Sequence, residues 1–475
     1  MNEKSNKLIS LLGSLDRTQR RGCRKLIRSS YFAGNDDLLA FFDEIAKRLD
    51  RAKSLDKREV WGGVFGKKKP FNDVRFRKYT SDLFKLIREY LVQETLNAEP
   101  ELRNYLYLAA LEKQNPDKLI RGVERNWEDI ARPNDGYSHT SYLYRHLLEE
   151  RKYALLNYEH RPQERSNLEA IGSSLDVYFI VMKLRNALQS QTLIHHVDQQ
   201  SYDLRLVPEI VRFLDETGTY LDRPVVAIYY YMFKMLTEDS THDAYYRYKQ
   251  LLFTETERLT QDRSFSLVQP ALNYCRRRIN VGERDFLREY LDVYRHALDH
   301  GLFDGEVLDP LQFRNTILIA LRHGDYEWTE HYIEHYQDRL PERQRINAVN
   351  YNLATLYFYQ KDYDQALDYL RDVEYENTTY NLNSKTMLLA IYYETDASMS
   401  LDSLFDSIGA YLNRHKELPY TAKEAFGNLV SLTRRLTRLL PGDRRAIEQL
   451  KKDLTDKQYV ASRPWLEEKI AEFER

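Results

Sequence analysis

The stretch YNLATLYFYQKDYDQALDYL, residues 351–370, sets the small residues Ala354 and Ala366 among large rings and leucines. Its apolar residues recur three and four positions apart, which is typical of amphipathic helices. Two helices that cross at close range need small side chains at their contact, while larger side chains fill the surrounding gaps. We therefore expect both alanines to be buried where one helix crosses another.

The same stretch resembles the tetratricopeptide repeat (TPR), whose pattern runs Trp-x2-Leu-Gly-x2-Tyr, then Ala, then an aromatic residue, then Pro. The turn glycine of the repeat recurs at Gly324, 37 residues before Lys361, and at Gly282, 42 residues before Gly324. The resemblance implies a degenerate, right-handed α-solenoid of antiparallel helix pairs over residues 266–415. The places of the pattern are taken by Asn350, Leu353, Ala354, Tyr357, Ala366, Leu370 and Thr378.

The whole chain favours helices. Glycine, with 17 copies, and proline, with 13, are scarce in 475 residues, and no stretch shows sustained strand alternation. Few breakers between abundant helix formers favour an all-α protein, and the length exceeds what one hydrophobic core usually serves. We predict a basic helical N-terminal domain at 1–98, irregular helical hairpins at 99–265, degenerate repeats at 266–415 and C-terminal capping helices at 416–475.

The composition indicates in which compartment the protein functions and which classes of partner it can bind. The 71 basic and 73 acidic residues nearly balance, which argues against a chain devoted to DNA binding. Two cysteines are too few for a disulfide framework or a thiolate metal site, and they fit a reducing cytosol. No run approaches the roughly 18 apolar residues of a membrane span, and the first residues indicate a mature helix without a cleavage site. We predict a soluble, cytoplasmic protein.

Two strings resemble motifs of enzymes. His331, Glu334 and His335 form an H-x-x-E-H string, the signature of inverted zinc peptidases. Tyr332 and Ile333 between them are needed for helix packing, so a solvated helix face is the favoured interpretation and a hydrolase the least favoured hypothesis. The string GGVFGKKKP at 62–70 fails the P-loop spacing, because a lysine stands where the second glycine is required. We predict a non-enzymatic protein without cofactor or metal.

Basic side chains are concentrated in the N-terminal domain, where residues 1–100 hold 22 basic and 14 acidic residues. Such an excess can bind phosphates through the release of counterions, although a charge run is usually only a solvated face. A nucleic-acid-associated regulator is therefore the alternative function. The candidate contact residues are Arg17, Arg21, Arg24, Arg28, Lys67, Lys68, Lys69, Arg75, Arg77 and Lys78.

The TPR resemblance implies that the first helices of successive pairs line a concave, ligand-binding face. Arginine binds carboxylates through two parallel hydrogen bonds, and tyrosine offers a large contact area with a polar tip. We predict a scaffold or adaptor that binds a peptide or protein with acidic and apolar groups; alternatively, degenerate repeats fill this groove with their own aromatic side chains. The residues placed on this face are Asn273, Arg277, Arg314, Arg322, Tyr351, Thr355, Tyr359 and Tyr393.

The chain is also similar to a group of helical, TPR-like proteins from Bacteroidota bacteria. The stretches LRHGDYEWTEHYIEHY at 321–336 and VFGKKKPFNDVRFRKYTSDL at 64–83 carry this similarity. It implies a bacterial cytosolic setting and adds nothing about chemistry.

Overall fold

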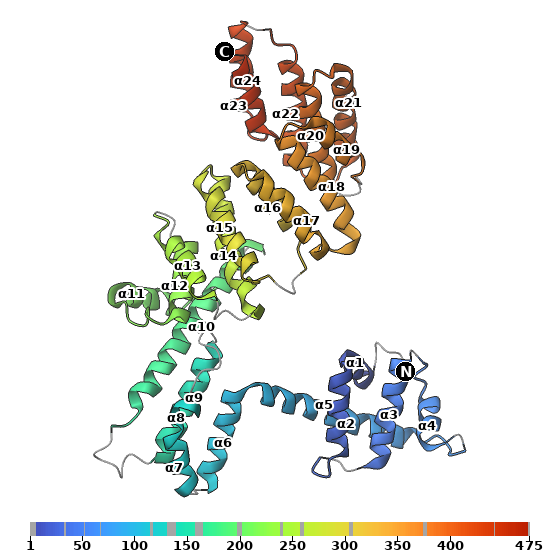
Figure 1. Ribbon diagram of the computed structural model, residues 1–475, viewed down its shortest axis with the longest axis vertical. Helices are drawn as coiled ribbons and strands as arrows, with labels where there is room; N and C mark the ends of the chain where they lie inside the picture. Colours follow the sequence, from blue (N-terminus) through green and yellow to red (C-terminus); the bar gives the residue numbers. More distant parts are fainter. Residues whose placement is uncertain are drawn as a thin grey trace. The chain divides into compact units, whose positions relative to one another are not determined.

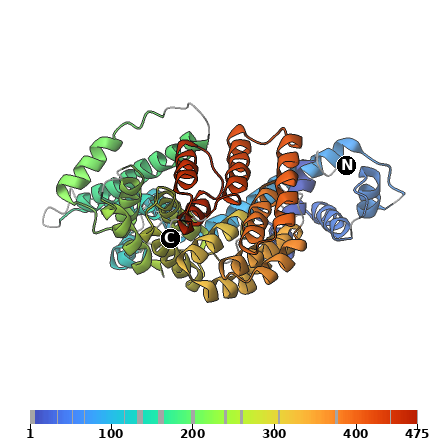
Figure 2. The same ribbon diagram turned by 90° about the horizontal axis from the view of Figure 1, so that it is seen from above.

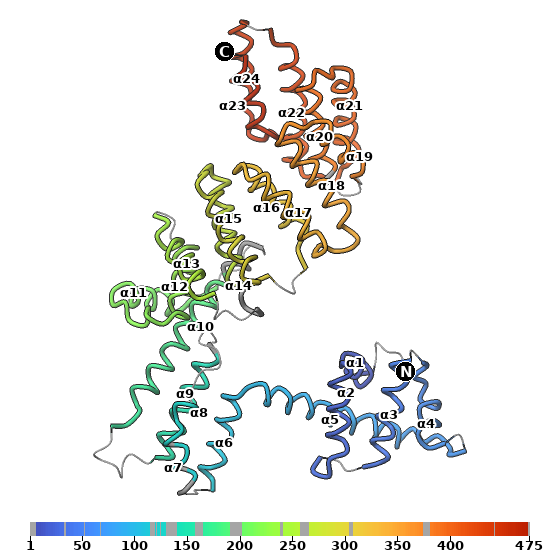
Figure 3. Tube along the Cα trace, in the orientation of Figure 1, coloured from blue at the N-terminus to red at the C-terminus, as the bar shows by residue number. Residues whose placement is uncertain are grey.

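The protein is built from helices (Figures 1 and 3). The computed structural model describes residues 6–32, 35–51, 53–66, 68–114, 117–130, 139–156, 165–196, 202–237, 241–256, 261–303, 307–373, 378–440 and 442–473. These residues form α1 to α24 and the short 3-10 helix η3, and no strand occurs among them. The prediction of an all-α protein is confirmed.

The chain divides into two compact units, Met1–Phe233 and Lys234–Arg475. The finer division into four regions stays a prediction. The helices up to the unit boundary are α1 (Lys7–Ser14), α2 (Arg17–Arg28), α3 (Asp36–Asp50), α4 (Lys57–Phe65), α5 (Asp73–Ala98), α6 (Pro100–Gln114), α7 (Asp117–Arg125), α8 (Trp127–Ile130), α9 (His139–Leu156), α10 (Leu168–His196), α11 (Val207–Thr217) and α12 (Pro224–Thr237). The second unit continues with α13 (Asp243–Thr254), α14 (Gln261–Asn280), α15 (Asp285–Asp299), α16 (Pro310–His323), α17 (Tyr326–Tyr336), η3 (Gln337–Arg339), α18 (Glu342–Tyr359), α19 (Tyr363–Arg371), α20 (Thr378–Glu394), α21 (Ser398–Arg414), α22 (Tyr420–Leu436), α23 (Arg444–Asp456) and α24 (Arg463–Glu472).

The first five helices begin at capping residues that satisfy backbone amides with no partner inside the helix. A side-chain oxygen accepts a hydrogen bond from a first-turn amide in each case. The caps are Asn6, Asp16, Asn35, Asp56 and Asn72. These helices share one core, whose members at 2% exposure or less include Leu12, Ile27, Phe41, Trp61, Phe76, Leu83 and Ile87.

Helices of the second unit pack mainly against their chain neighbours. α14 packs against α15, α16 against α17, α18 against α19, and α20 against α21. In addition, α16 contacts α18 and α18 contacts α20, so the first helices of three successive pairs touch one another. Figure 2 shows the yellow-to-orange helices of this unit lying side by side.

The two alanines of residues 351–370 lie where α18 packs against α19. Ala354 and Ala366 have no exposed surface, and they share a core with Leu370 of α19 and Met387 and Ile391 of α20. Methyl groups at these points leave room for the larger neighbours from three helices. The predicted burial of both alanines is confirmed.

One backbone conformation recurs at the turn inside four successive helix pairs. Gly282, Gly324, Lys361 and Asp396 all have positive φ angles, of 100°, 93°, 63° and 53°. At each turn the amide of the following residue donates to a carbonyl five residues back, in the Schellman pattern that ends many helices. These bonds are Glu283 to Arg278, Asp325 to Ala320, Asp362 to Tyr357 and Ala397 to Tyr392, at 2.9–3.1 Å.

Opposite stability changes are expected at two of these turns. Gly324→Ala should destabilise the protein by about 1 kcal/mol, because a side chain disfavours the left-handed region even though no atom lies within 4 Å of the added Cβ. Lys361→Gly should stabilise it by about 0.5 kcal/mol, because the strain relieved exceeds the entropy cost of glycine. Urea denaturation followed by circular dichroism measures both changes.

The control for this pair is Gly427→Ala within α22, where the glycine has an ordinary helical φ and no atom lies within 4 Å of the added Cβ. Alanine is the better helix former, so this change should stabilise the protein by up to about 1 kcal/mol. Loss of stability in both Gly324→Ala and Lys361→Gly would contradict a shared left-handed turn.

Buried tyrosines form much of the core of the second unit. The hydroxyl groups of Tyr294 and Tyr332 lie 2.6 Å apart, and Tyr290 and Thr316 are hydrogen bonded at 2.9 Å. All four side chains are buried, so each hydroxyl needs such a partner. These pairs connect α15 with α16 and α17 by polar contacts inside an otherwise apolar core.

Candidate functional site

Three arginines of the predicted partner surface lie on α14 and α16. Arg277 and Arg322 are exposed and Arg314 is half-buried. None of the three forms an ion pair with a carboxylate in the described part of the chain; Arg277 instead lies over the Tyr274 ring, 5.7 Å from its centre. Asn273 is exposed on the same helix as Arg277. The three positive charges are therefore open to an external anion.

The predicted site residues of α18 are less accessible. Tyr351 and Thr355 are only 7% and 6% exposed, and the Thr355 hydroxyl donates to the Tyr351 carbonyl at 2.8 Å. Tyr359 is half-buried, and burial raises the pKa of its phenol while the charge of Arg322 opposes this rise. The structure thus leaves Tyr359 partly accessible and places the other two side chains in the core.

Tyr393 lies apart from this group, near the end of α20. Its ring contacts the Trp465 ring edge-on, with centres 5.4 Å apart. Burial raises the pKa of Tyr393 to about 12, and the charge of Glu472 adds to that rise. Tyr393 therefore belongs to the contact between α20 and α24.

An open pocket of about 610 Å³ lies beside the turn between α16 and α17. The Arg295 guanidinium donates to Asp325 at 2.7 Å and lies 4.6 Å from the centre of the Trp328 ring. The sequence analysis did not predict this pocket, although the turn glycine that it identified, Gly324, lies in the pocket wall. Its lining residues are Arg295, Asp299, Gly324, Asp325, Tyr326, Glu327 and Trp328.

The predicted basic residues of the N-terminal helices fall into two classes. Arg24 pairs with Asp43, Arg75 with Asp37 and Arg77 with Asp73, at 2.9, 2.9 and 2.6 Å. The Lys69 ammonium lies 4.6 Å from the centre of the Phe65 ring. The exposed members without an ion pair among the described residues are Arg17, Arg21, Arg28, Lys68, Lys69 and Lys78, whereas Lys67 lies outside the described residues.

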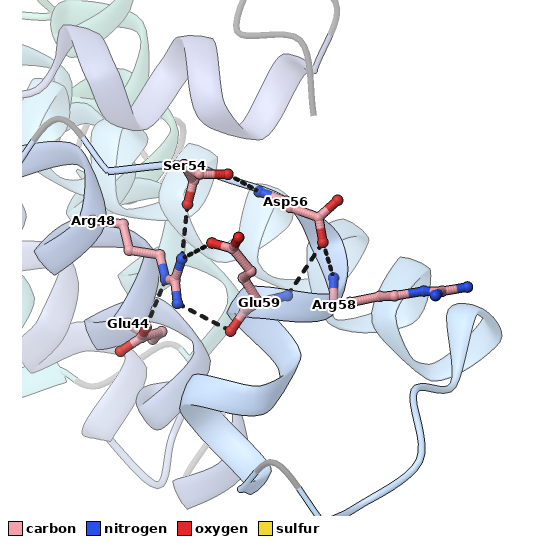
Figure 4. Close-up of polar contacts among 6 residues, drawn as sticks. All are labelled: Glu44, Arg48, Ser54, Asp56, Arg58 and Glu59. Carbon is pink, nitrogen blue, oxygen red and sulfur yellow. Dashed lines mark hydrogen bonds and ion pairs between the residues drawn. The ribbon is translucent and has the colours of Figure 1, made fainter.

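Arg48 is the clearest example of a basic side chain in this region whose charge is neutralised by internal carboxylates (Figure 4). Its guanidinium donates to Glu44 at 2.6 Å, to Glu59 at 3.0 Å and to the Ser54 carbonyl at 2.8 Å. Burial opposes its charge, but the two carboxylates outweigh that effect and raise the pKa of Arg48. This arginine joins α3 to α4 and is not available to a ligand.

The H-x-x-E-H string lies on α17 with His331, Glu334 and His335 exposed. The centres of the two imidazole rings are 3.7 Å apart, and Nδ1 of His335 is hydrogen bonded to the His331 carbonyl at 3.1 Å. In the part of the chain that the structure describes, no group of three or more His, Cys, Asp or Glu side chains is placed to hold a metal ion.

Both cysteines are free and buried. Burial raises the pKa of Cys23 and of Cys275 to about 12. The Cys275 thiol donates to the Tyr245 hydroxyl at 3.2 Å, and that hydroxyl donates to Glu289 at 3.1 Å. Protonated, buried thiols are poor nucleophiles, so this polar cluster between α13, α14 and α15 fits a structural role.

Among the helices that the structure describes, none combines the length and the apolar character needed to cross a membrane. Comparison of the chain with protein-family models, with curated proteins and with solved structures gave no match.

Proposed function

We propose that residues 266–415 form a degenerate, TPR-like right-handed α-solenoid, and that the protein is a cytoplasmic, non-enzymatic adaptor for a peptide or protein partner. The repeated turn carries this proposal. Left-handed residues at positions 282, 324, 361 and 396 end the first helix of four successive pairs, at spacings of 42, 37 and 35 residues. Repeat arrays are built from such units, each packed on its neighbours.

The contacts between α16, α18 and α20 support the same arrangement, because stacked helix pairs bring their first helices together. In this proposal the first helices face the concave side, and the helices of residues 416–475 cap the last pair. The buried Tyr351 and Thr355 support the concave face from beneath. Contacts to the partner then come from exposed side chains of α14, α16 and the end of α18.

The proposed partner segment carries carboxylates beside apolar groups. Arg277, Arg314 and Arg322 lack carboxylate partners among the described residues, and bidentate pairing with a carboxylate is a strong contact for an arginine. The half-buried Tyr359 adds an aromatic surface for an apolar side chain. A partner segment with both acidic and aliphatic or aromatic residues fits these side chains.

Selection of random peptides displayed on phage against the purified full-length protein tests the proposal. We expect enrichment of sequences that join Asp or Glu to apolar residues, because the arginines attract carboxylates. The triple variant Arg277→Glu, Arg314→Glu, Arg322→Glu should bind the enriched peptides at least tenfold more weakly, since each removed charge contact is replaced by repulsion. Fluorescence anisotropy of a labelled peptide measures the change.

The matched control changes three other arginines to glutamate: Arg288, Arg414 and Arg438. These are exposed arginines on or near α15, α21 and α22, and they have no carboxylate partners among the described residues. The affinity of this control should stay within threefold of that of the unmodified protein. Equal losses in both triple variants, or selection of peptides without acidic residues, would count against the proposed surface.

A further inference from the structure

One face of α2 presents positive charges that no carboxylate of the described residues neutralises. Arg17, Arg21, Lys25 and Arg28 follow one another at spacings of four, four and three residues, so they form a single stripe along the helix. All four are exposed and make no ion pair within the described residues. We call these four residues the α2 stripe.

The side of α2 next to the stripe forms ion pairs with α3. Arg20 pairs with Asp50 at 2.5 Å and Arg24 with Asp43 at 2.9 Å, which ties α2 to α3. On the opposite side Cys23 and Ile27 are buried in the core of the first five helices. The helix is therefore held in one orientation, with the α2 stripe as its outward face.

An exposed aromatic pair stands at the end of the stripe. Tyr31 is 87% exposed and Phe32 36% exposed, and their rings meet edge-on with centres 5.0 Å apart. An aromatic ring this exposed gains little from folding. It does offer a flat face on which an unpaired base can stack.

We propose that the α2 stripe and Tyr31 form a binding surface for single-stranded nucleic acid. At a rise of 1.5 Å per residue the stripe is about 16 Å long, and neighbouring cations lie about 4.5–6 Å apart along the helix axis. The four cations contact successive phosphates, and Tyr31 stacks on a base at the end of this segment. Unpaired bases are required for that contact, so a duplex fits less well.

Two other anionic partners fit this surface less well. A membrane-binding helix inserts an apolar face into the lipid, but the apolar face of α2 is already buried in the protein. An acidic protein would form ion pairs with the four cations, but it would not require the exposed planar face of Tyr31. The regular spacing of four charges favours a partner whose own charges repeat at a fixed interval.

Fluorescence anisotropy of labelled (dT)12 and rU12 with the full-length protein tests this inference. The logarithm of the association constant should fall with the logarithm of the salt concentration, with a slope of about −3 for four phosphate contacts. Neutralising the stripe with Arg17→Gln, Arg21→Gln, Lys25→Gln and Arg28→Gln should weaken binding at least 100-fold at 50 mM salt and flatten that slope. Tyr31→Ala should weaken binding about tenfold, and Tyr31→Phe should retain the affinity.

A second quadruple variant supplies the control, with Lys53, Arg58, Lys85 and Arg88 changed to glutamine. These exposed side chains lie just before α4, on α4 and on α5, and their loss removes the same charge from the same five-helix region. We expect its affinity to change less than threefold. Circular dichroism shows whether each variant keeps its helices.

Equal losses in both quadruple variants would overturn the α2 stripe as the site. Binding of a duplex as tight as that of (dT)12, without an effect of Tyr31→Ala, would overturn the single-strand assignment. Binding to phosphatidylserine vesicles or polyglutamate in place of the oligonucleotides would assign the surface to a different partner. The inference does not rest on the adaptor function, because α2 belongs to the first unit and peptide selection by the second unit should be unchanged in the α2 variant.

Discussion

Replacing Ala366 with leucine is expected to destabilise the second unit by about 3 kcal/mol. Ala366 and Ala354 have no exposed surface at the contact between α18 and α19. The extra carbon atoms of leucine must push the helices apart or force neighbouring side chains out of their preferred rotamers. Such overpacking costs typically 1–3 kcal/mol, and occasionally more. Urea denaturation followed by circular dichroism measures the free energy of unfolding.

Two matched variants separate overpacking from other effects. Gln365→Leu adds a leucine at the exposed neighbouring position on α19 and should change the free energy of unfolding by less than about 0.5 kcal/mol. Ala366→Gly removes the methyl group and should cost about 1 kcal/mol, mainly through helix propensity. If Ala366→Leu proved as stable as Gln365→Leu, the two helices would not be in close contact at this residue.

Sequence patterns predicted the helices because local rules determine them. Spacing of three and four between apolar residues marks a helix face, and small residues within it mark close crossings, as the burial of Ala354 and Ala366 confirms. The turn after α18 was harder to locate, because a lysine occupies the left-handed position that glycine holds after α16. The repeat-like pattern on both sides of it, together with its distance from Gly324 in the sequence, revealed it.

The accessible surface was harder to predict than the helices. α18 contacts α16, α17, α19 and α20, so buried residues surround much of its circumference. A helix covered on several sides lacks the polar stripe that identifies a solvent face. For this reason the sequence did not distinguish the buried Tyr351 and Thr355 from the more accessible Tyr359.

It was equally hard to predict which basic residues of the first helices form ion pairs. Arg24 and Arg28 both lie among the basic residues of α2, yet Arg24 pairs with Asp43 and Arg28 has no ion pair in the described part of the chain. The difference depends on a carboxylate 19 residues away that packing brings close. Spacing within one helix predicts which charges share a face, whereas the tertiary structure decides which of them remain unpaired.

The other large effect is expected at Lys469, whose removal should release α24 from the end of α20. Its side chain is only 5% exposed and pairs with Glu394 at 2.6 Å and Glu472 at 2.8 Å. Burial alone would lower the pKa of Lys469, but these two carboxylates outweigh burial and raise it. The ion pair therefore stabilises the fold fully below the ordinary lysine pKa of about 10.4, and this contribution is lost as the pH rises through the raised value.

Lys469→Met should destabilise the docking of α24 by about 3 kcal/mol at pH 7, because it leaves the 20% exposed Glu394 as an uncompensated charge. Adding Glu394→Gln to that variant should recover part of the loss, because the amide is neutral and its oxygen still accepts the hydrogen bond that Trp465 donates to Glu394 at 3.3 Å. Hydrogen exchange of peptides covering residues 463–472 measures the local opening. Faster exchange in the double variant than in Lys469→Met would mean that packing, and not the buried charge pair, holds α24 in place.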